Sequence, residues 1–121
     1  MKREIKFNAW DSFQKKMYEW HQLVEMDIKG ELTLSNFLNG FVKHIKPLQY
    51  IGLLDKHGKE IFEGHIVKPF SDDINIAQII YLAPKFVIAT KKKDGSYLLW
   101  SYFKDDIEII GNIHQDKNLL K

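Results

Sequence analysis

The sequence predicts a mainly β protein, built as a small SH3-like barrel with an N-terminal β-hairpin and one short amphipathic helix. Three observations lead to this prediction. Short runs of β-branched and aromatic residues recur along the chain, Gly and Asp turns separate these runs, and only one stretch has apolar residues at helical spacing. The length of 121 residues is usual for one domain, so we expect a single domain over residues 1–121.

Residues 1–20 predict the N-terminal hairpin. Ile5, Phe7 and Ala9 occupy alternate positions, and residues 17–20 alternate again after a turn-like stretch at 11–15. Two short alternating runs joined by a polar turn are typical of a hairpin.

Residues 32–46 predict the helix. Thr33 is a favoured N-cap residue, and Pro47 limits the helix at its other end. Between them, apolar residues recur at helical spacing, at Leu34, Phe37, Leu38, Phe41, Val42 and Ile45.

Residues 48–114 predict the barrel. Asp55 and Gly58 mark the clearest turn, because an Asp side chain accepts hydrogen bonds from the backbone just after it and Gly tolerates a positive φ. Short apolar runs separated by polar turns follow, at 64–68, 76–82, 86–90, 97–103 and 107–110.

Composition limits the function. Lys and Arg exceed Asp and Glu by only two, a charge that requires no nucleic-acid partner. The chain has no cysteine, which excludes disulfides, thiolate zinc sites and cysteine nucleophiles. No apolar run is long enough for a signal peptide or a membrane span, so we expect a cytoplasmic protein without a membrane partner.

No familiar catalytic or metal motif is present. The sequence lacks a nucleotide-binding glycine loop, an HExxH helix, a GxSxG elbow and an EF-hand loop, so we expect neither an enzyme nor a cofactor. The histidines lack the close spacing that places two ligands on one face, which argues against a metal site; they are His21, His44, His57, His65 and His114.

A small enzyme with carboxylate catalysis is one alternative. Its candidates are Glu63, Asp105 and Glu108, with Asp106 beside them. The structural interpretation is favoured for each, because polar corners need solvated side chains and acceptors for backbone N–H groups. We therefore assign no catalytic residue.

A nucleic-acid-binding module is the other alternative. Lys91, Lys92 and Lys93 lie at an expected hairpin tip, and the following strand carries Tyr97, Trp100 and Tyr102. Lysines pair with phosphates while bases stack on aromatic rings. Lysines also keep strand edges soluble, and the low net charge favours that interpretation.

Aromatic residues of the N-terminal hairpin favour a protein partner or self-association over nucleic acid. A two-stranded ribbon has little core of its own, so Trp10, Tyr18 and Trp20 must pack against the barrel or another chain. A homo-oligomer is therefore one expectation.

Three blocks of sequence carry a family resemblance. The first is Ile5, Lys6, Phe7, Ala9, Trp10 and Asp11. The second runs through Gln49, Tyr50, Gly52, Leu53, Asp55, Gly58, Lys59, Glu60, Ile61, Glu63, Gly64, Ile66 and Val67. The third is Ile107, Glu108, Ile110, Gly111, Asn112 and Ile113. Together these blocks resemble the YopX family, small proteins found mostly in phages and prophages.

The chain departs from the family pattern at three places, one of which is the tail, where the proline often seen past Asn112 is missing. His65 stands where the family usually has an acidic residue, and Asn8 stands where an arginine is common. The resemblance implies an SH3-type barrel, a mobile-element origin and no established activity. It also implies structural roles for the motif positions Trp10, Tyr50, Gly52, Asp55, Gly58, Glu63, Gly64, Gly111 and Asn112.

These observations lead to one functional hypothesis. The protein is expected to be a non-enzymatic interaction module of a phage or prophage that binds a host or phage macromolecule.

Overall fold

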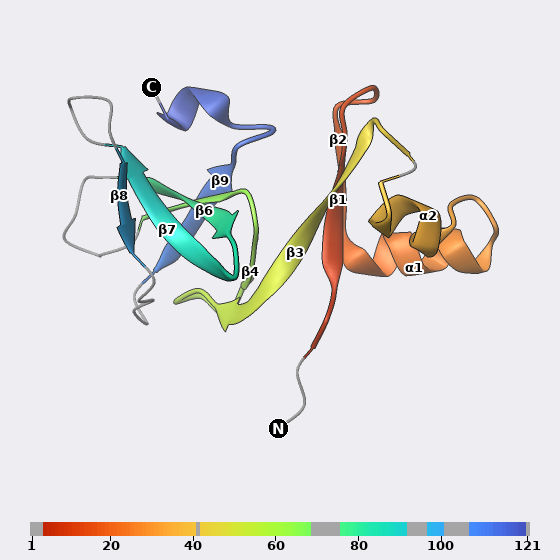
Figure 1. Cartoon of the computed structure of the whole chain (residues 1–121), viewed down its shortest axis with the longest axis horizontal. Coiled ribbons are helices and arrows are strands. Elements are labelled where there is room, and N and C mark those ends of the chain that lie inside the picture. The colour runs from red at the N-terminus through yellow and green to blue at the C-terminus, as the bar shows by residue number, and fades with distance from the viewer. Residues whose placement is uncertain (1–3, 41, 69–75, 92–96, 101–106, 121) are drawn as a thin grey trace. The chain divides into compact units, whose positions relative to one another are not determined.

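The computed structural model describes residues 4–40, 42–68, 76–91, 97–100 and 107–120 (Figure 1). The chain divides into two compact units, the N-terminal unit Met1–Tyr50 and the C-terminal unit Ile51–Lys121. The prediction of a mainly β protein is confirmed, because the described residues form two antiparallel sheets and only two α-helices.

The N-terminal unit is a small sheet with helices on one face. β1 (Phe7–Asp11) and β2 (Lys16–Tyr18) form the predicted hairpin, and β3 (Ile45–Leu54) pairs with the other edge of β1. α1 (Trp20–Ile28) and α2 (Leu34–Leu38) lie on the same side of these strands in Figure 1. Strand and helices share one core, formed by Ala9, Leu23, Leu32 and Phe37.

The prediction of one helix over residues 32–46 is wrong, because the helix there is much shorter and the described residues contain a second helix. α2 ends at Leu38, because Gly40 adopts a φ of 78° and leaves the helical conformation. Val42 and Ile45 still pack against the core, but from the turn before β3 and from β3 itself. Phe41 lies outside the described residues.

The second helix, α1, was missed. Glu19 precedes it and is not a favoured N-cap residue, but Gln22 Oε1 accepts a hydrogen bond from the Glu19 N–H at 2.8 Å. Asp27 near the end of α1 then accepts the N–H of Leu34, the first residue of α2, at 3.1 Å. Side chains thus satisfy backbone groups at the start of both helices.

Pro47 lies inside β3 rather than before it. Its Cα partner is Ala9 on β1. β4 (Glu60–Phe62) has only three residues and follows the turn after β3. These strands form one sheet in the order β2-β1-β3-β4. Pro47 has no N–H, so this position of β3 contributes only its carbonyl to the pairing.

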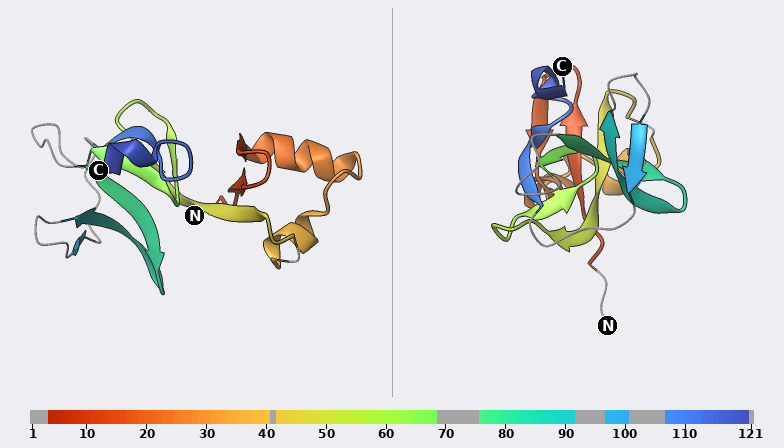
Figure 2. Two further views of the ribbon diagram at one scale, coloured as in Figure 1. Left: turned by 90° about the horizontal axis from the view of Figure 1, so that it is seen from above. Right: turned by 90° about the vertical axis from the view of Figure 1, so that its left-hand side faces the viewer.

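The C-terminal unit contains a five-stranded antiparallel sheet in the order β8-β7-β6-β5-β9. Figure 2 shows the strong twist of this sheet, which curls it into half of a barrel. The strands are β5 (His65–Lys68), β6 (Ala77–Leu82), β7 (Lys85–Lys91), β8 (Tyr97–Trp100) and β9 (Glu108–Asn112), and a 3-10 helix spans Lys117–Leu120. Their core contains Ile61, Val67, Ala77, Ile79, Ile88 and Ile107.

Across the described residues, the helices are too short or too polar to cross a membrane.

Candidate functional site

The second and third sequence blocks meet at one corner of the C-terminal unit, centred on the buried carboxylate of Asp55. Asp55 Oδ1 accepts hydrogen bonds from the N–H groups of His57 and Lys59, both at 2.9 Å. Asp55 Oδ2 accepts a third from the N–H of Ile109 on β9, at 3.1 Å. This side chain closes its own turn and ties that turn to a strand 54 residues later.

The charge of Asp55 suits this role. Burial alone would raise the pKa of its carboxyl, but the hydrogen bonds from the Lys59, Ile109 and His57 amides outweigh burial, and the pKa lies below its ordinary value. The Gly58 N–H also donates to the Asp55 carbonyl at 3.0 Å, which confirms the predicted turn.

His65, which differs from the acid expected from the family resemblance, acts as a hydrogen-bond acceptor. Its Nδ1 accepts the N–H of Phe62 at 2.9 Å, and the two rings meet edge to face with centroids 6.1 Å apart. Burial lowers the pKa of His65 to about 4, and the charge of Lys59 acts in the same direction against that of Asp55. His65 is therefore a neutral acceptor where a carboxylate would be a charged one.

The third block forms a turn at the end of β9. His65 and Asn112 are Cα partners, as are Ile66 and Gly111. Asn112 Oδ1 accepts the N–H groups of His114 and Gln115, at 3.0 and 2.9 Å. The sheet pairing therefore brings the second and third blocks together.

Gly111 is required by a close approach. A Cβ at this position would lie 2.7 Å from Oδ2 of Asp116. The same oxygen accepts the N–H of Asn112 at 3.0 Å, so Asp116 cannot move away without losing that bond. Gly64 is held by its backbone instead. Its N–H donates to the Ile79 carbonyl and its carbonyl accepts the N–H of Ile113, both at 2.8 Å.

A side-chain contact at the surface crosses this corner. His57 Nε2 and Glu108 Oε2 are 2.9 Å apart, and Lys56 Nζ is 3.9 Å from the same oxygen. The hydrogen bond with His57 lowers the pKa of Glu108, and the nearby charges of Lys56, His57 and Lys68 add to this. The carboxylate alternative named Glu63, which is half-buried, and Asp105 and Asp106, which lie outside the described residues.

The lysine hairpin can be placed only in part. In the register of β7 and β8, Lys91 lies opposite Tyr97, and Trp100 lies opposite Ile88. Their side chains, together with Lys92, Lys93 and Tyr102, lie outside the described residues.

Two of the three aromatic residues expected on the N-terminal hairpin pack against the core of the N-terminal unit, and one of these, Trp20, begins α1 instead of continuing the hairpin. Tyr18 and Trp20 pack against that core, and Trp10 is 9% exposed. The ring of Trp20 lies 6.2 Å from that of Phe7, centroid to centroid.

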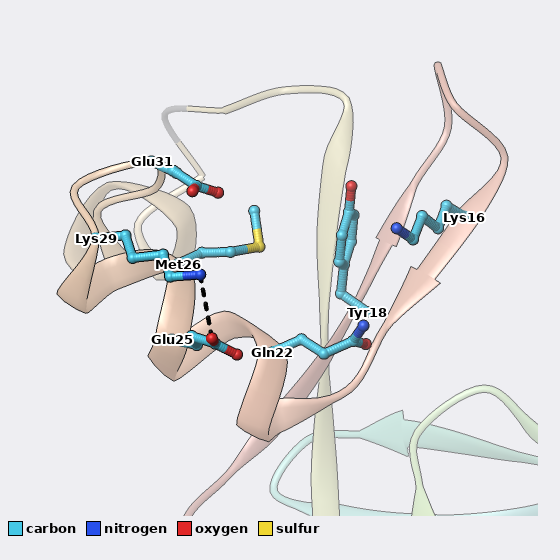
Figure 3. Close-up of a pocket in the computed structure, with 7 residues that line it drawn as sticks. All are labelled: Lys16, Tyr18, Gln22, Glu25, Met26, Lys29 and Glu31. Carbon is cyan, nitrogen blue, oxygen red and sulfur yellow. Dashed lines mark ion pairs between the residues drawn. The ribbon is translucent and has the colours of Figure 1, made fainter.

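An open hollow of about 290 Å³ lies between β2 and α1 (Figure 3). The Tyr18 ring and the Met26 thioether provide its apolar walls. Its rim is charged, with Glu25 and Lys29 paired at 3.1 Å and Lys16 Nζ 4.8 Å from the centre of the Tyr18 ring. The complete lining is Lys16, Tyr18, Gln22, Glu25, Met26, Lys29 and Glu31. No pattern in the sequence indicates this hollow, because its lining comes from a strand, a helix and the turn after that helix.

A family model described as YopX protein matches residues 6–121 of the chain. Among solved structures, the chain is similar to the crystal structure of protein EF1440 from Enterococcus faecalis. The TM-score is 0.62 and the sequences are 21% identical, with 99% of this chain and 100% of that chain covered. The comparison with curated proteins finds no match. The structural similarity extends over both units and shows the fold alone.

Proposed function

The chain belongs to the YopX family, and from this premise we propose that it is a non-catalytic interaction module that binds a protein partner through the hollow of its N-terminal unit. The setting that the family implies, a phage or prophage in the bacterial cytoplasm, is part of this proposal. The observation that carries it is the chemistry of the hollow, an apolar wall of Tyr18 and Met26 inside a rim of mixed charge.

The size of the hollow favours a partner's side chain as its occupant. Pockets for drug-sized ligands and cofactors enclose about 300–1,000 Å³ and bury most of the ligand. The hollow is at the lower limit, at about 290 Å³, and it is open to solvent. It has room for one or two protruding side chains rather than for an enclosed cofactor.

The lining suits recognition of protein. A flexible thioether such as Met26 adapts to apolar side chains of different shape, and tyrosine is enriched at the centres of protein interfaces. The rim carries Lys16, Glu31 and the Glu25–Lys29 pair, so charges of both signs are available to a peptide. Because the rim carries negative as well as positive charges, it disfavours a polyanion as the occupant of the hollow.

The use of the motif residues supports a non-catalytic role. Within the described residues, the Asp55 carboxylate accepts three backbone N–H groups, and Asn112 Oδ1 accepts two. Glu108 pairs with His57 at the surface. These side chains hold the backbone of the C-terminal unit, which leaves recognition to other surfaces.

A peptide-display selection against the purified protein tests this function. We expect selected peptides to share an apolar side chain flanked by charges, and to lose binding to Glu25→Trp, which fills the hollow from an exposed helix position. His21→Trp is the matched control, because His21 is exposed on the same helix and does not line the hollow. Equal binding to both variants, or no enriched peptide, would contradict the proposal.

A further inference from the structure

The tip of the N-terminal sheet carries an exposed aromatic stack. The rings of Phe13, in the β1–β2 turn, and His44, just before β3, are 4.3 Å apart and within 2° of parallel. Phe13 is 78% exposed. A phenyl ring that is stacked on one face and exposed to water is a platform for a further flat ring.

The platform is held in place by the backbone around it. The Asp11 carboxylate accepts the N–H groups of Phe13 and Gln14, at 2.9 and 3.0 Å. The Ser12 N–H and hydroxyl both donate to the His44 carbonyl, at 2.9 and 3.1 Å. The two ring-bearing segments are therefore joined, and little ordering is needed when a ligand binds.

Three exposed lysines lie within two positions of Phe13 or His44 along the chain. The exposed Lys15 follows Phe13 in the turn, Lys43 precedes His44, and Lys46 lies opposite Trp10 on β1. Within the described part of the chain, none of these three ammonium groups has a carboxylate partner. Asp11 is only 4% exposed and is occupied by backbone N–H groups. The surface of the tip is thus basic, in a chain whose net charge is only +2.

Lys15 adds an independent observation. Its φ is 55°, the left-handed conformation that glycine and asparagine adopt far more readily than lysine. Such a conformation is strained in a residue with a Cβ. The turn therefore carries a lysine side chain at a position where glycine would be less strained.

From the exposed stack and the unpaired lysines, we propose that the β1–β2 tip binds single-stranded nucleic acid, with a base stacked on Phe13 and phosphates paired with Lys15, Lys43 and Lys46. Stacking on one ring and pairing with phosphates do not distinguish ribose from deoxyribose. DNA and RNA single strands therefore bind with similar affinity. This inference is independent of the proposed function, because its residues do not line the hollow.

Fluorescence anisotropy with labelled dT12 and U12 at low salt tests the inference. Phe13→Ala should weaken binding of both strands about tenfold, the effect of losing one stacked base. Ile28→Ala is the matched control, since Ile28 is an equally exposed apolar residue of the same unit, at 79%. Unchanged binding by Phe13→Ala, or no binding of either strand by the wild type, would overturn the proposal.

Salt dependence tests the three lysines. Replacing Lys15, Lys43 and Lys46 with Gln should reduce the slope of log affinity against log salt by about 2, from about 0.7 per lost phosphate contact. The same replacement of Lys59, Lys85 and Lys117 changes the net charge equally but leaves the tip intact. If the slope falls only in that control, or only in a variant of Lys91, Lys92 and Lys93, the nucleic acid binds elsewhere and the proposal is overturned.

Discussion

Asp11 and Asp55 show how one local motif serves two different purposes. Both residues end a run of strand, both are nearly buried, at 4% and 6% exposure, and each Oδ1 accepts the N–H of the residue two positions later. Among the described residues, the Asp11 carboxylate accepts only the local N–H groups of Phe13 and Gln14. Asp55 also accepts the N–H of the distant Ile109.

The two turns therefore have different roles: the Asp11 turn exposes side chains to solvent, and the Asp55 turn fastens one part of the sheet to another. The Asp11 turn leaves Phe13 exposed, so its rigidity serves the side chains at the tip. The Asp55 turn is joined to β9, because the Lys56 N–H also donates to the Ile107 carbonyl at 2.8 Å. We therefore expect changes at Asp55 to affect stability and changes at the Asp11 turn to affect recognition.

The largest effect is expected for Asp55→Ala. Three N–H groups lose a charged acceptor, one of them on a strand 54 residues away, and hydrogen bonds to charged groups are among the strongest in proteins, so the free energy of unfolding should fall by about 4 kcal/mol. Denaturant titration measures the loss, and hydrogen exchange at the Ile109 and Lys59 amides locates it.

Asp55→Asn distinguishes the hydrogen bonds of Asp55 within its own turn from its hydrogen bond to Ile109 on β9. Its amide oxygen can accept the turn N–H groups, while its NH2 group faces the Ile109 N–H and loses that bond. We expect a smaller loss, about 2 kcal/mol, with faster exchange at Ile109 and little change at Lys59. Equal acceleration at both amides would show that the turn and the strand contact do not separate.

The same comparison explains what the sequence could predict. The Asp55 turn was predicted because its bonds to His57 and Lys59 lie within four residues. The Ile109 contact was not predicted, because no local pattern specifies a partner so far along the chain. The hairpin was predicted from alternation, but α1 was missed because Glu19 and Gln22 form an unusual start to a helix.

The candidate sites were harder to predict because the residues that form them are far apart in the sequence. The lysine hairpin drew attention because its residues are adjacent in sequence. The Phe13 platform needs His44, 31 positions later, and only the pairing of β1 with β3 brings these residues together.

The next effect is a pH dependence centred on His65. Because burial lowers its pKa to about 4 from an ordinary value of 6.5, the unfolded chain binds more protons between these two pH values. The free energy of unfolding should therefore fall, by on the order of 2 kcal/mol, as the pH falls from about 6.5 to about 4. Below that range, the depressed pKa of Asp55 makes its own contribution disappear.

His65→Asn is the control for this slope. Asn Oδ1 can accept the Phe62 N–H but does not titrate, so the variant should have a lower stability at neutral pH and a flatter slope between about pH 6.5 and 4. Denaturant titrations at several pH values compare the two proteins. A slope as steep as that of the wild type would assign the pH dependence to other groups.

A smaller effect is expected for Asp11→Ala. Two local N–H groups lose their acceptor and no bond to a distant strand is lost, so the free energy of unfolding should fall by less than in Asp55→Ala, by about 1 kcal/mol. Binding of single strands should weaken as well, because the Phe13 platform loses part of its support. A stability loss as large as that of Asp55→Ala would remove the distinction between the two turns.

The smallest effect is expected for Glu108→Gln, although Glu108 lies beside the Asp55 anchor. The side chains of His57 and Glu108 are 54% and 30% exposed, and solvent screens the charges of such a pair. Gln can still accept a hydrogen bond from His57, so the free energy of unfolding should change less than in Asp11→Ala, and the change should disappear in high salt. Denaturant titrations at low and high salt measure both quantities. A large loss that persists in salt would make the His57–Glu108 pair part of the anchor, and the strength of the Asp55 turn would then depend on a surface contact as well as on its buried carboxylate.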